Sequence, residues 1–124
     1  MDKKTILIVD DSADTRLLLS ARLKVHHYHT VFAADALQAM SVALKERPDV
    51  ILLDLGLPGG NGLVVLQRFK SNTFLSGIPV IIVTAEDPQV AEARTLEGGA
   101  VAFLQKPVDQ AKLIAAVQQA VGTT

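Results

Sequence analysis

The chain has 124 residues, 13 acidic and 12 basic side chains, a formal net charge of −1 at pH 7 and no cysteine. This length fits one domain that buries roughly two thirds of the surface of the unfolded chain, and it excludes a two-domain enzyme. The near-neutral charge excludes binding to nucleic acid or anionic lipid through a broad basic surface, and the absence of cysteine excludes disulfides and thiolate metal sites.

Short β-branched runs alternate with longer segments of helical period, and no linker rich in proline, glycine or serine separates them. We expect strands, in chain order, over Thr5–Val9, His29–Ala33, Val50–Leu53, Val80–Val83 and Ala102–Leu104. Each strand is followed by an expected helix, and these helices span Ala13–Lys24, Ala36–Glu46, Leu63–Lys70, Pro88–Glu97 and Asp109–Val121. Five strand–helix units in succession predict an α/β fold in which helices cover both faces of a parallel sheet.

The strands differ in how they place apolar residues. Ile6–Val9, Val50–Leu53 and Val80–Val83 are apolar at every position, as expected of central strands that are covered on both faces. The second strand alternates over His29–Phe32, which predicts an edge position in the sheet.

Polar side chains follow four of these strands directly. Asp10 and Asp11 come after the first strand, Asp54 after the third, Thr84 after the fourth and Lys106 after the fifth. In parallel sheets of this kind, ligands bind in a crevice at the carboxyl ends of the strands. We therefore expect the functional site there.

Each of these residues also has an ordinary structural explanation. Asp11 or Ser12 is suited to cap the first helix, and Asp54 is suited to start the turn that Pro58–Gly62 completes. Three carboxylates at one end of a sheet nevertheless repel one another and lose solvation, and capping alone does not need three. A cation between them is therefore expected.

Mg²⁺ is the cation that this residue set favours. It is a hard octahedral ion that usually binds one or two carboxylates together with a substrate phosphate. Three aspartates and Lys106 carry about −2 in total, which one Mg²⁺ brings close to zero, ready for the charge of a transferred phosphoryl group. In such a site an aspartate can act as nucleophile, while Thr84 and Lys106 offer a hydroxyl and a point charge to the phosphoryl oxygens.

The chain resembles the receiver domain of two-component response regulators over essentially its whole length. Four segments carry the resemblance, in order: Ile6–Ser12 (ILIVDDS), Ile51–Gly62 (ILLDLGLPGGNG), Pro79–Ala85 (PVIIVTA) and Gly99–Pro107 (GAVAFLQKP). The resemblance implies a flavodoxin-like (βα)5 three-layer sandwich with strand order 2-1-3-4-5. We expect residues 1–124 to form this single domain, with a core of about residues 4–121 and no attached output domain.

The resemblance also implies the chemistry of the acidic site. It assigns phosphorylation to Asp54, by a sensor histidine kinase or a histidine phosphotransfer protein. It assigns Mg²⁺ to Asp11, Asp54 and the carbonyl of Gly56, with Asp10 orienting a water on the metal. Gly56, together with Glu86 two residues after Thr84, is expected to tune the lifetime of the phosphoryl group.

Further residues are implied to bind the phosphoryl group and to respond to it. Thr84 and Ala85 belong to this set: Thr84 is expected to move toward the phosphoryl group, and the ring of Phe103 is expected to turn into the space that Thr84 leaves. Lys106 is expected to bond a phosphoryl oxygen. Its peptide bond to Pro107 is expected to be cis, an isomer almost confined to X–Pro bonds.

Several positions depart from the usual receiver pattern. His27 stands where a glycine often ends the first helix, so a left-handed backbone there would carry a steric penalty. Ala36 replaces another frequent glycine, and Val101–Ala102 replaces a commonly acidic pair. Phe103 lacks the hydroxyl of the frequent tyrosine.

Three histidines and a tyrosine stand together at His26–His29. A turn followed by an alternating edge strand does not obviously bring three imidazoles together, and no carboxylate is nearby in the sequence. We therefore favour a solvated helix end over a metal site.

The last expected helix has more apolar residues than one buried stripe needs. Leu113, Val117 and Ala120 already form a stripe at helical spacing. Three residues are left over: Ala111, Ile114 and Ala115. We predict that this leftover face, beside Val101–Ala102 and the fourth helix, is an apolar docking or homodimer surface, with small residues packed near a surface as the alternative.

The implied function is that of a phosphoacceptor signalling domain, a switch that catalyses only its own phosphorylation and slow hydrolysis. A downstream protein effector is expected to bind the fourth helix, fifth strand and fifth helix. Direct nucleic-acid binding is not expected, because the acidic and basic side chains nearly balance. Membrane association is not expected, because no apolar run approaches the roughly 20 residues that span a bilayer. The absence of cysteine and of a secretory signal favours the cytoplasm.

Three other functions are weighed against this one. A phosphohydrolase with an aspartate nucleophile would need a second carboxylate two positions on, where Gly56 stands. A flavin-binding module needs a phosphate loop of small residues after the first strand, where Asp10 and Asp11 would repel a phosphate. A phosphorylation-independent interaction module of the same fold usually lacks part of the acidic set, which this chain keeps.

Overall fold

A computed structural model describes residues 3–58 and 62–122. Its strands are β1 (Thr5–Val9), β2 (His29–Ala33), β3 (Val50–Leu53), β4 (Val80–Thr84) and β5 (Ala102–Gln105). Its helices are α1 (Ala13–Lys24), α2 (Ala36–Glu46), α3 (Gly62–Ser71), α4 (Pro88–Glu97) and α5 (Gln110–Gly122). The elements are those expected from the sequence, and their bounds differ from the expected ones by one residue at ends of α3, β4, β5 and α5.

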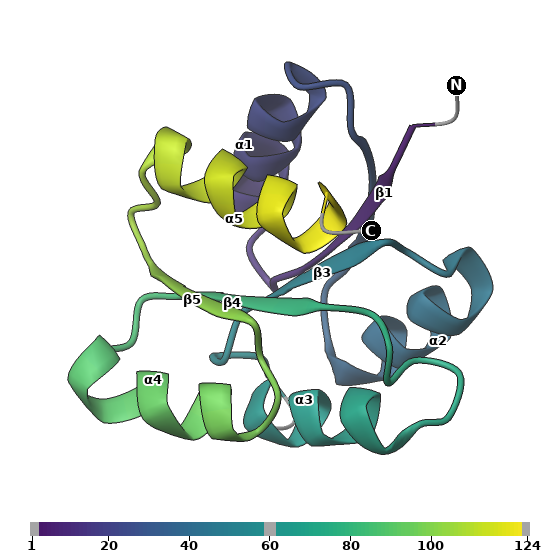
Figure 1. The fold of residues 1–124 in the computed structure, drawn as a ribbon, viewed down its shortest axis with the longest axis vertical. Helices are drawn as coiled ribbons and strands as arrows, with labels where there is room; N and C mark the ends of the chain where they lie inside the picture. Colours follow the sequence, from purple (N-terminus) through teal and green to yellow (C-terminus); the bar gives the residue numbers. More distant parts are fainter. Residues whose placement is uncertain (1–2, 59–61, 123–124) are drawn as a thin grey trace.

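The strands form one parallel sheet of order β2-β1-β3-β4-β5. This confirms the flavodoxin-like order, and it places β2 at an edge as its alternating sequence predicts. Helices α1 and α5 cover one face of the sheet, and α2, α3 and α4 cover the other (Figure 1). The β3 and β1 strands therefore lie inside the molecule, with Asp54 and Asp10 directly after them.

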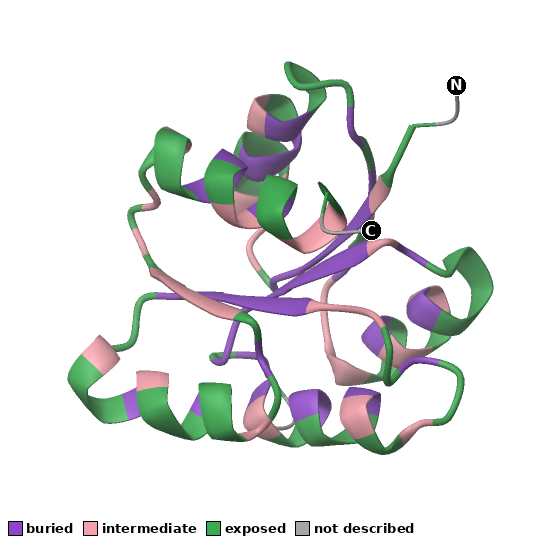
Figure 2. Ribbon diagram, viewed as in Figure 1, coloured by how far each residue is buried: buried purple, intermediate pink, exposed green. Residues whose placement is uncertain are grey.

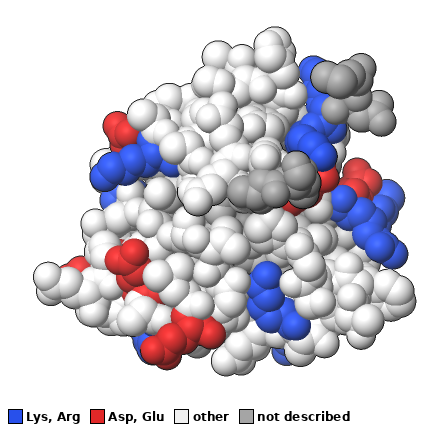
Figure 3. Space-filling model, viewed as in Figure 1, with Lys and Arg blue, Asp and Glu red and all other residues white. Residues whose placement is uncertain are grey.

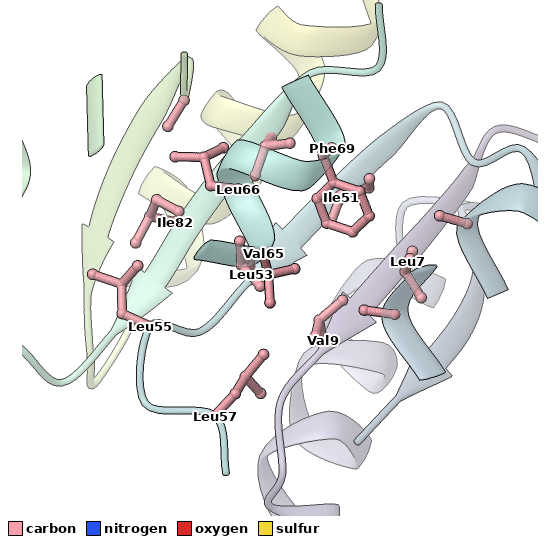
Figure 4. Packing of buried hydrophobic residues seen from close by; sticks show 14 of the residues in the cluster. Leu7, Val9, Ile51, Leu53, Leu55, Leu57, Val65, Leu66, Phe69 and Ile82 are labelled. Atoms are coloured by element: carbon pink, nitrogen blue, oxygen red, sulfur yellow. The ribbon is translucent and has the colours of Figure 1, made fainter. Parts of the chain in front are cut away.

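Alternate residues of each central strand enter two separate hydrophobic clusters. In β1, Ile6 and Ile8 belong to the cluster under α1 and α5, whereas Leu7 and Val9 belong to the cluster under α2, α3 and α4. This follows from the two-residue period of a strand, which sends neighbouring side chains to opposite faces. Buried residues accordingly run along the strands and along the inner faces of the helices (Figure 2). Part of the cluster under α2, α3 and α4 is seen from close by in Figure 4.

Two residues that follow helices have left-handed backbone. His27, just after α1, has a φ of 68°, and Arg47, the cap of α2, has a φ of 48°. Both positions favour glycine, because the Cβ of any other residue crowds the backbone there. Arg47 also places its guanidinium 5.5 Å from the centre of the Phe74 ring, a cation–π contact that His27 does not share.

The prediction that Ile114 belongs to an uncovered face of α5 is wrong. Ile114 is only 7% exposed and packs in the same cluster as Leu113 and Val117. The physical reason is that a helix lying on a sheet buries a stripe at least about 100° wide, which takes in two consecutive residues. Ala111 and Ala115 are exposed, so the leftover face is narrower than predicted.

Helix α1 leaves two leucines exposed and buries a serine. Leu17 is 64% exposed and Leu18 is 53% exposed, whereas Ser20 is buried on the inner side. The Ser20 hydroxyl lies 2.7 Å from the hydroxyl of Thr30 on β2, and either can donate to the other. The pair satisfies two polar groups inside the protein without water.

Charged side chains of both signs are scattered over the surface. On the face shown in Figure 3 they lie mostly around the rim, and the surface over α5 is largely uncharged, because Lys112 is the one charged residue of that helix. Over residues 3–58 and 62–122, no helix has the length and apolar character needed to cross a bilayer.

Candidate functional site

The strand order brings the expected polar residues together at the carboxyl ends of the strands. Strand β3 pairs with β1 so that Leu53 lies opposite Val9, and each of these residues is followed by an aspartate. Asp54 and Asp10 are therefore neighbours across the two strands. On the other side of β3, β4 ends at Thr84, and beyond it Lys106 follows β5.

Asp54 is buried, with 8% of its surface exposed. Its backbone N–H donates to the carbonyl of Val9 at 3.0 Å, which continues the β3–β1 ladder. Its carboxylate accepts two bonds: Oδ1 from the N–H of Gly56 at 3.1 Å, and Oδ2 from the Nζ of Lys106 at 3.2 Å. The carboxylate thus has a fixed direction and a cation beside it.

Asp10 is still more deeply buried, with 2% of its surface exposed. Its Oδ1 accepts the N–H of Ser12 at 2.9 Å, and its Oδ2 accepts Lys106 Nζ at 2.7 Å. Asp11, by contrast, is exposed. Ser12, not Asp11, caps α1, since its Oγ accepts the N–H of Thr15 at 3.2 Å.

Lys106 connects the two buried aspartates. Burial alone would lower its pKa, but the hydrogen bond to Asp10 and the negative charges of Asp54 and Asp10 outweigh burial, so the pKa of the ammonium is raised above its usual value. The backbone N–H of Lys106 donates to the carbonyl of Thr84 at 2.8 Å, which holds the chain beside β4. The Lys106–Pro107 peptide bond is cis.

The acidic residues form a group that suits a hard cation. Asp10, Asp11 and Asp54 each offer a carboxylate oxygen, and these three oxygens lie within 4.8 Å of one another. With one ammonium among three carboxylates, the cluster keeps a negative excess that a divalent cation would balance, and oxygen ligands are those that Mg²⁺ prefers. The residues present therefore fit Mg²⁺.

Gly56, the remaining expected metal ligand, lies on the exposed side of the loop after β3. The leucines on either side of it, Leu55 and Leu57, are both 6% exposed and pack in the cluster under α3. Gly56 is thus presented at the surface by two buried neighbours. Gly59–Asn61, part of the turn that the sequence predicts here, lie outside the described residues.

The expected switch residues lie at the end of β4 and on the neighbouring strand β5. Thr84 is 1% exposed, and its Oγ1 accepts the N–H of Glu86 at 3.4 Å. Ala85 is exposed next to it. Phe103 is half-buried on β5 and packs against the cluster that contains Ile82, its partner in the β4–β5 register.

The histidines do not form a second site. His26, His27 and His29 are all exposed, and Tyr28 between them is turned into the core, where burial raises its pKa. Within the part of the chain that the structure describes, the three aspartates are the one group of potential metal-binding side chains that converges. This agrees with the expectation of a solvated helix end.

Sequence reasoning missed Arg16. Its guanidinium donates to the backbone carbonyl of Asp10 at 2.7 Å, so a cation on α1 holds the β1–α1 turn from outside the acidic group. The available signal was its position: Arg16 is four residues after the cap Ser12, one helical turn into α1 and close to the two aspartates.

Comparisons with known proteins agree with this geometry. The model of the response regulator receiver domain family matches residues 6–118. The response regulator PleD of Caulobacter vibrioides is 38% identical over 113 residues, which are 91% of this chain and 25% of PleD. Protein PilH of Pseudomonas aeruginosa is 37% identical over 109 residues, which are 88% of this chain and 90% of PilH. The chain thus spans a quarter of one relative and most of the other.

A solved structure is similar over nearly the whole chain. It is the receiver domain of the sensor histidine kinase PA1611 of Pseudomonas aeruginosa, described with a magnesium ion coordinated in the active site cleft. It has a TM-score of 0.89 and 28% identity, and the match covers 98% of this chain and 100% of that one. Sequence, fold and the acidic group at the strand ends agree: the chain belongs to the response regulator receiver domain family of two-component signalling.

Proposed function

We propose that the chain is a phosphoacceptor whose Asp54 takes a phosphoryl group from the phosphohistidine of a sensor histidine kinase or of a histidine phosphotransfer protein. The observation that carries the proposal is the position of Lys106, whose Nζ lies 2.7 Å from Asp10 and 3.2 Å from Asp54. The ammonium lies between two neighbouring carboxylates, and it is in place to bond a phosphoryl oxygen when one arrives.

In the proposed reaction, an oxygen of the Asp54 carboxylate forms a bond to phosphorus while the P–N bond of the phosphohistidine breaks. The ring nitrogen keeps the electron pair of that bond. In the later hydrolysis, the oxygen of a water molecule bonds to phosphorus and the bond from Asp54 breaks. Inorganic phosphate leaves with both protons of the water, and the carboxylate is restored. The chain thereby modifies and resets itself, without turning over a separate substrate.

Asp11, Asp54 and the carbonyl of Gly56 would hold Mg²⁺, and Asp10 would act through a water molecule. When bound, the ion supplies positive charge against the oxygens of the transferred phosphoryl group. Asp54 is held for this task by the N–H of Gly56, while Asp10 keeps its direction through the N–H of Ser12.

The proposed output is a shift between two conformations of the surface formed by α4, β5 and α5. Thr84 is buried at the end of β4 with one weak bond to its hydroxyl, so it is free to bond a phosphoryl oxygen instead. Phe103 is half-buried two positions before the residue paired with Thr84, close enough to respond to that movement. A downstream protein effector, in the cytoplasm, would bind the conformation that phosphorylation favours.

The same surface is proposed as the place where a second copy would bind. Val101 is 54% exposed just before β5, and Ala111 and Ala115 are exposed on α5. Sedimentation with and without a phosphoryl mimic tests this: an increase in mass with the mimic supports a homodimer, and an unchanged monomer mass contradicts it.

The phosphoacceptor proposal is tested by incubation with Mg²⁺ and acetyl phosphate, followed by intact mass measurement. We expect wild type to gain the mass of one phosphoryl group and Asp54→Ala to gain none. Asp14→Ala is the matched control, because Asp14 is an exposed aspartate on α1 outside the acidic group, and it should behave as wild type. A wild type that stays unmodified contradicts the proposal.

A further inference from the structure

Gly62 begins α3 and packs directly against the backbone that carries Asp54. A Cβ atom at this position would lie 2.5 Å from the carbonyl oxygen of Asp54 and 2.6 Å from the Cα of Leu55. Contacts this short must be relieved by movement, and both atoms belong to the main chain, which cannot rotate away as a side chain can. Glycine is needed here because two backbones approach closely.

The question is which side would move if a side chain were present. Helix α3 is anchored in the core by Val65, Leu66 and Phe69, which are at most 1% exposed and point from the helix toward the sheet (Figure 4). On the other side, the N–H of Asp54 is bonded into the β3–β1 ladder at 3.0 Å. The two atoms that the Cβ would meet, the Asp54 carbonyl oxygen and the Leu55 Cα, lie just beyond this bond, so the displacement would fall on the segment Leu55–Gly56.

That segment carries the contacts that orient the site. The N–H of Gly62 donates to the carbonyl of Leu55 at 2.8 Å, which ties the start of α3 to the loop. The N–H of Gly56 donates to Asp54 Oδ1 at 3.1 Å, and the carbonyl of Gly56 is the proposed third ligand for Mg²⁺. A shift of Leu55–Gly56 would therefore turn the carboxylate and move the carbonyl at the same time.

We infer that Gly62 is a positioning residue for the phosphoacceptor: its lack of a side chain sets where the Asp54 carboxylate and the Gly56 carbonyl face the cation. The inference rests on the proposed function of Asp54. In Gly62→Ala we expect Mg²⁺ affinity and phosphorylation rate each to fall by about tenfold or more, since displacements of about 1 Å in a reacting geometry cost up to 100-fold.

Two other glycines provide matched controls. In Gly98→Ala the new Cβ would lie 3.2 Å from Leu66 Cδ2 and 3.3 Å from the carbonyl of Arg94, which disturbs α3 packing at a place remote from Asp54. In Gly77→Ala the Cβ would meet nothing within 4 Å. Gly98→Ala therefore reports the effect of general crowding, and Gly77→Ala reports the effect of the substitution itself.

The experiment is a Mg²⁺ titration of the four proteins, followed by the amide resonances of Asp54 and Gly56 in NMR spectra, with urea unfolding of each protein alongside. Weakened Mg²⁺ binding in Gly62→Ala, with near wild-type binding in Gly98→Ala and Gly77→Ala, supports the inference. If Gly62→Ala loses stability but binds Mg²⁺ as tightly as wild type, Gly62 has only a structural role and the inference is overturned. Should Gly62→Ala be unfolded in buffer, all four proteins are compared in sucrose, which favours the folded state.

Phosphorylation by acetyl phosphate is measured on the same four proteins. If the wild type binds Mg²⁺ but takes up no phosphoryl group, the proposed function fails, while the Mg²⁺ affinities still decide the role of Gly62. If all proteins are phosphorylated at the same rate, the positioning role is overturned and the proposed function stands.

Discussion

Lys106 lies closer to Asp10 than to the proposed phosphoacceptor: its Nζ is 2.7 Å from Asp10 and 3.2 Å from Asp54. The side chains of the two aspartates are 3% and 11% exposed, so water screens neither of them well. The ammonium is thus a structural counter-ion for Asp10 as well as the group that we propose to bond a phosphoryl oxygen. This double role has a consequence for stability.

Replacement of this lysine is expected to destabilise the protein even without phosphorylation. In Lys106→Met, the buried Asp10 and Asp54 would face each other with no cation between them, and loss of one partner from a buried ion pair costs roughly 3 kcal/mol. Urea unfolding in the presence of EDTA measures this loss. We also expect Mg²⁺ to restore part of the stability, more in the variant than in wild type, because a ligand that binds only the folded state stabilises it. Equal stability of the two proteins in EDTA would show that the ammonium is not needed as a counter-ion.

Glycine at the end of α1 is expected to stabilise the protein. His27 has a φ of 68° and an exposed side chain, so His27→Gly should raise the free energy of unfolding by about 0.5–1 kcal/mol. Arg47→Gly is the informative comparison, because Arg47 has a similar φ of 48° but also contacts the Phe74 ring. Loss of the contact with Phe74 offsets part of the stabilisation that comes from removing the backbone strain. We therefore expect the free energy of unfolding to rise less in Arg47→Gly than in His27→Gly. Urea unfolding of both variants decides, and a larger gain in Arg47→Gly would contradict this explanation.

Ile114 is expected to behave as a core residue. Because it is 7% exposed in the cluster under α5, Ile114→Ala should lower the free energy of unfolding by about 2–4 kcal/mol. Its neighbour Ala115 is exposed, so Ala115→Ser should change stability by less than about 0.5 kcal/mol. Thermal and urea unfolding measure both. A small effect of Ile114→Ala would restore the view that this residue lies on an uncovered face.

The buried hydroxyl pair of Ser20 and Thr30 is expected to be strongly coupled. Either Ser20→Ala or Thr30→Val alone leaves one hydroxyl without its partner at 2.7 Å, at a cost of roughly 1–3 kcal/mol. The double variant removes both polar groups, so its loss of stability should be smaller than the sum of the two single losses. A double-mutant cycle measures this difference directly. Additive losses would mean that the two hydroxyls do not depend on each other.

Much of the fold was accessible from the sequence because the signal is repeated five times. Strands apolar at every position, such as Val50–Leu53, identify the buried centre of a parallel sheet, and the alternation of His29–Phe32 identifies an edge. The site follows from the parallel arrangement of the strands, because the residues after parallel strands all lie at the carboxyl end of the sheet. This rule predicts that Asp10, Asp54 and Lys106 lie together, as the bonds from Lys106 to both aspartates show.

The rest depended on packing that the sequence does not express locally. The rotation of α5 on the sheet decides that Ile114 is buried while Ala115 is not, and no spacing pattern fixes that rotation to within one residue. The bond from Arg16 to the carbonyl of Asp10 requires knowledge of where a long side chain folds back. Glycine is needed at position 62 because its backbone lies directly against the main chain of Asp54 and Leu55. The spacing of these residues in the sequence does not predict that contact.

The contact between Lys106 and Asp10 joins residues that are 96 positions apart in the chain. Until β5 has been made and has joined the sheet, the carboxylates after β1 and β3 lack their counter-ion, so a growing or truncated chain has no complete acceptor site. If Asp54 is the acceptor, its phosphorylation therefore depends on a residue that comes last along the chain among those of the site.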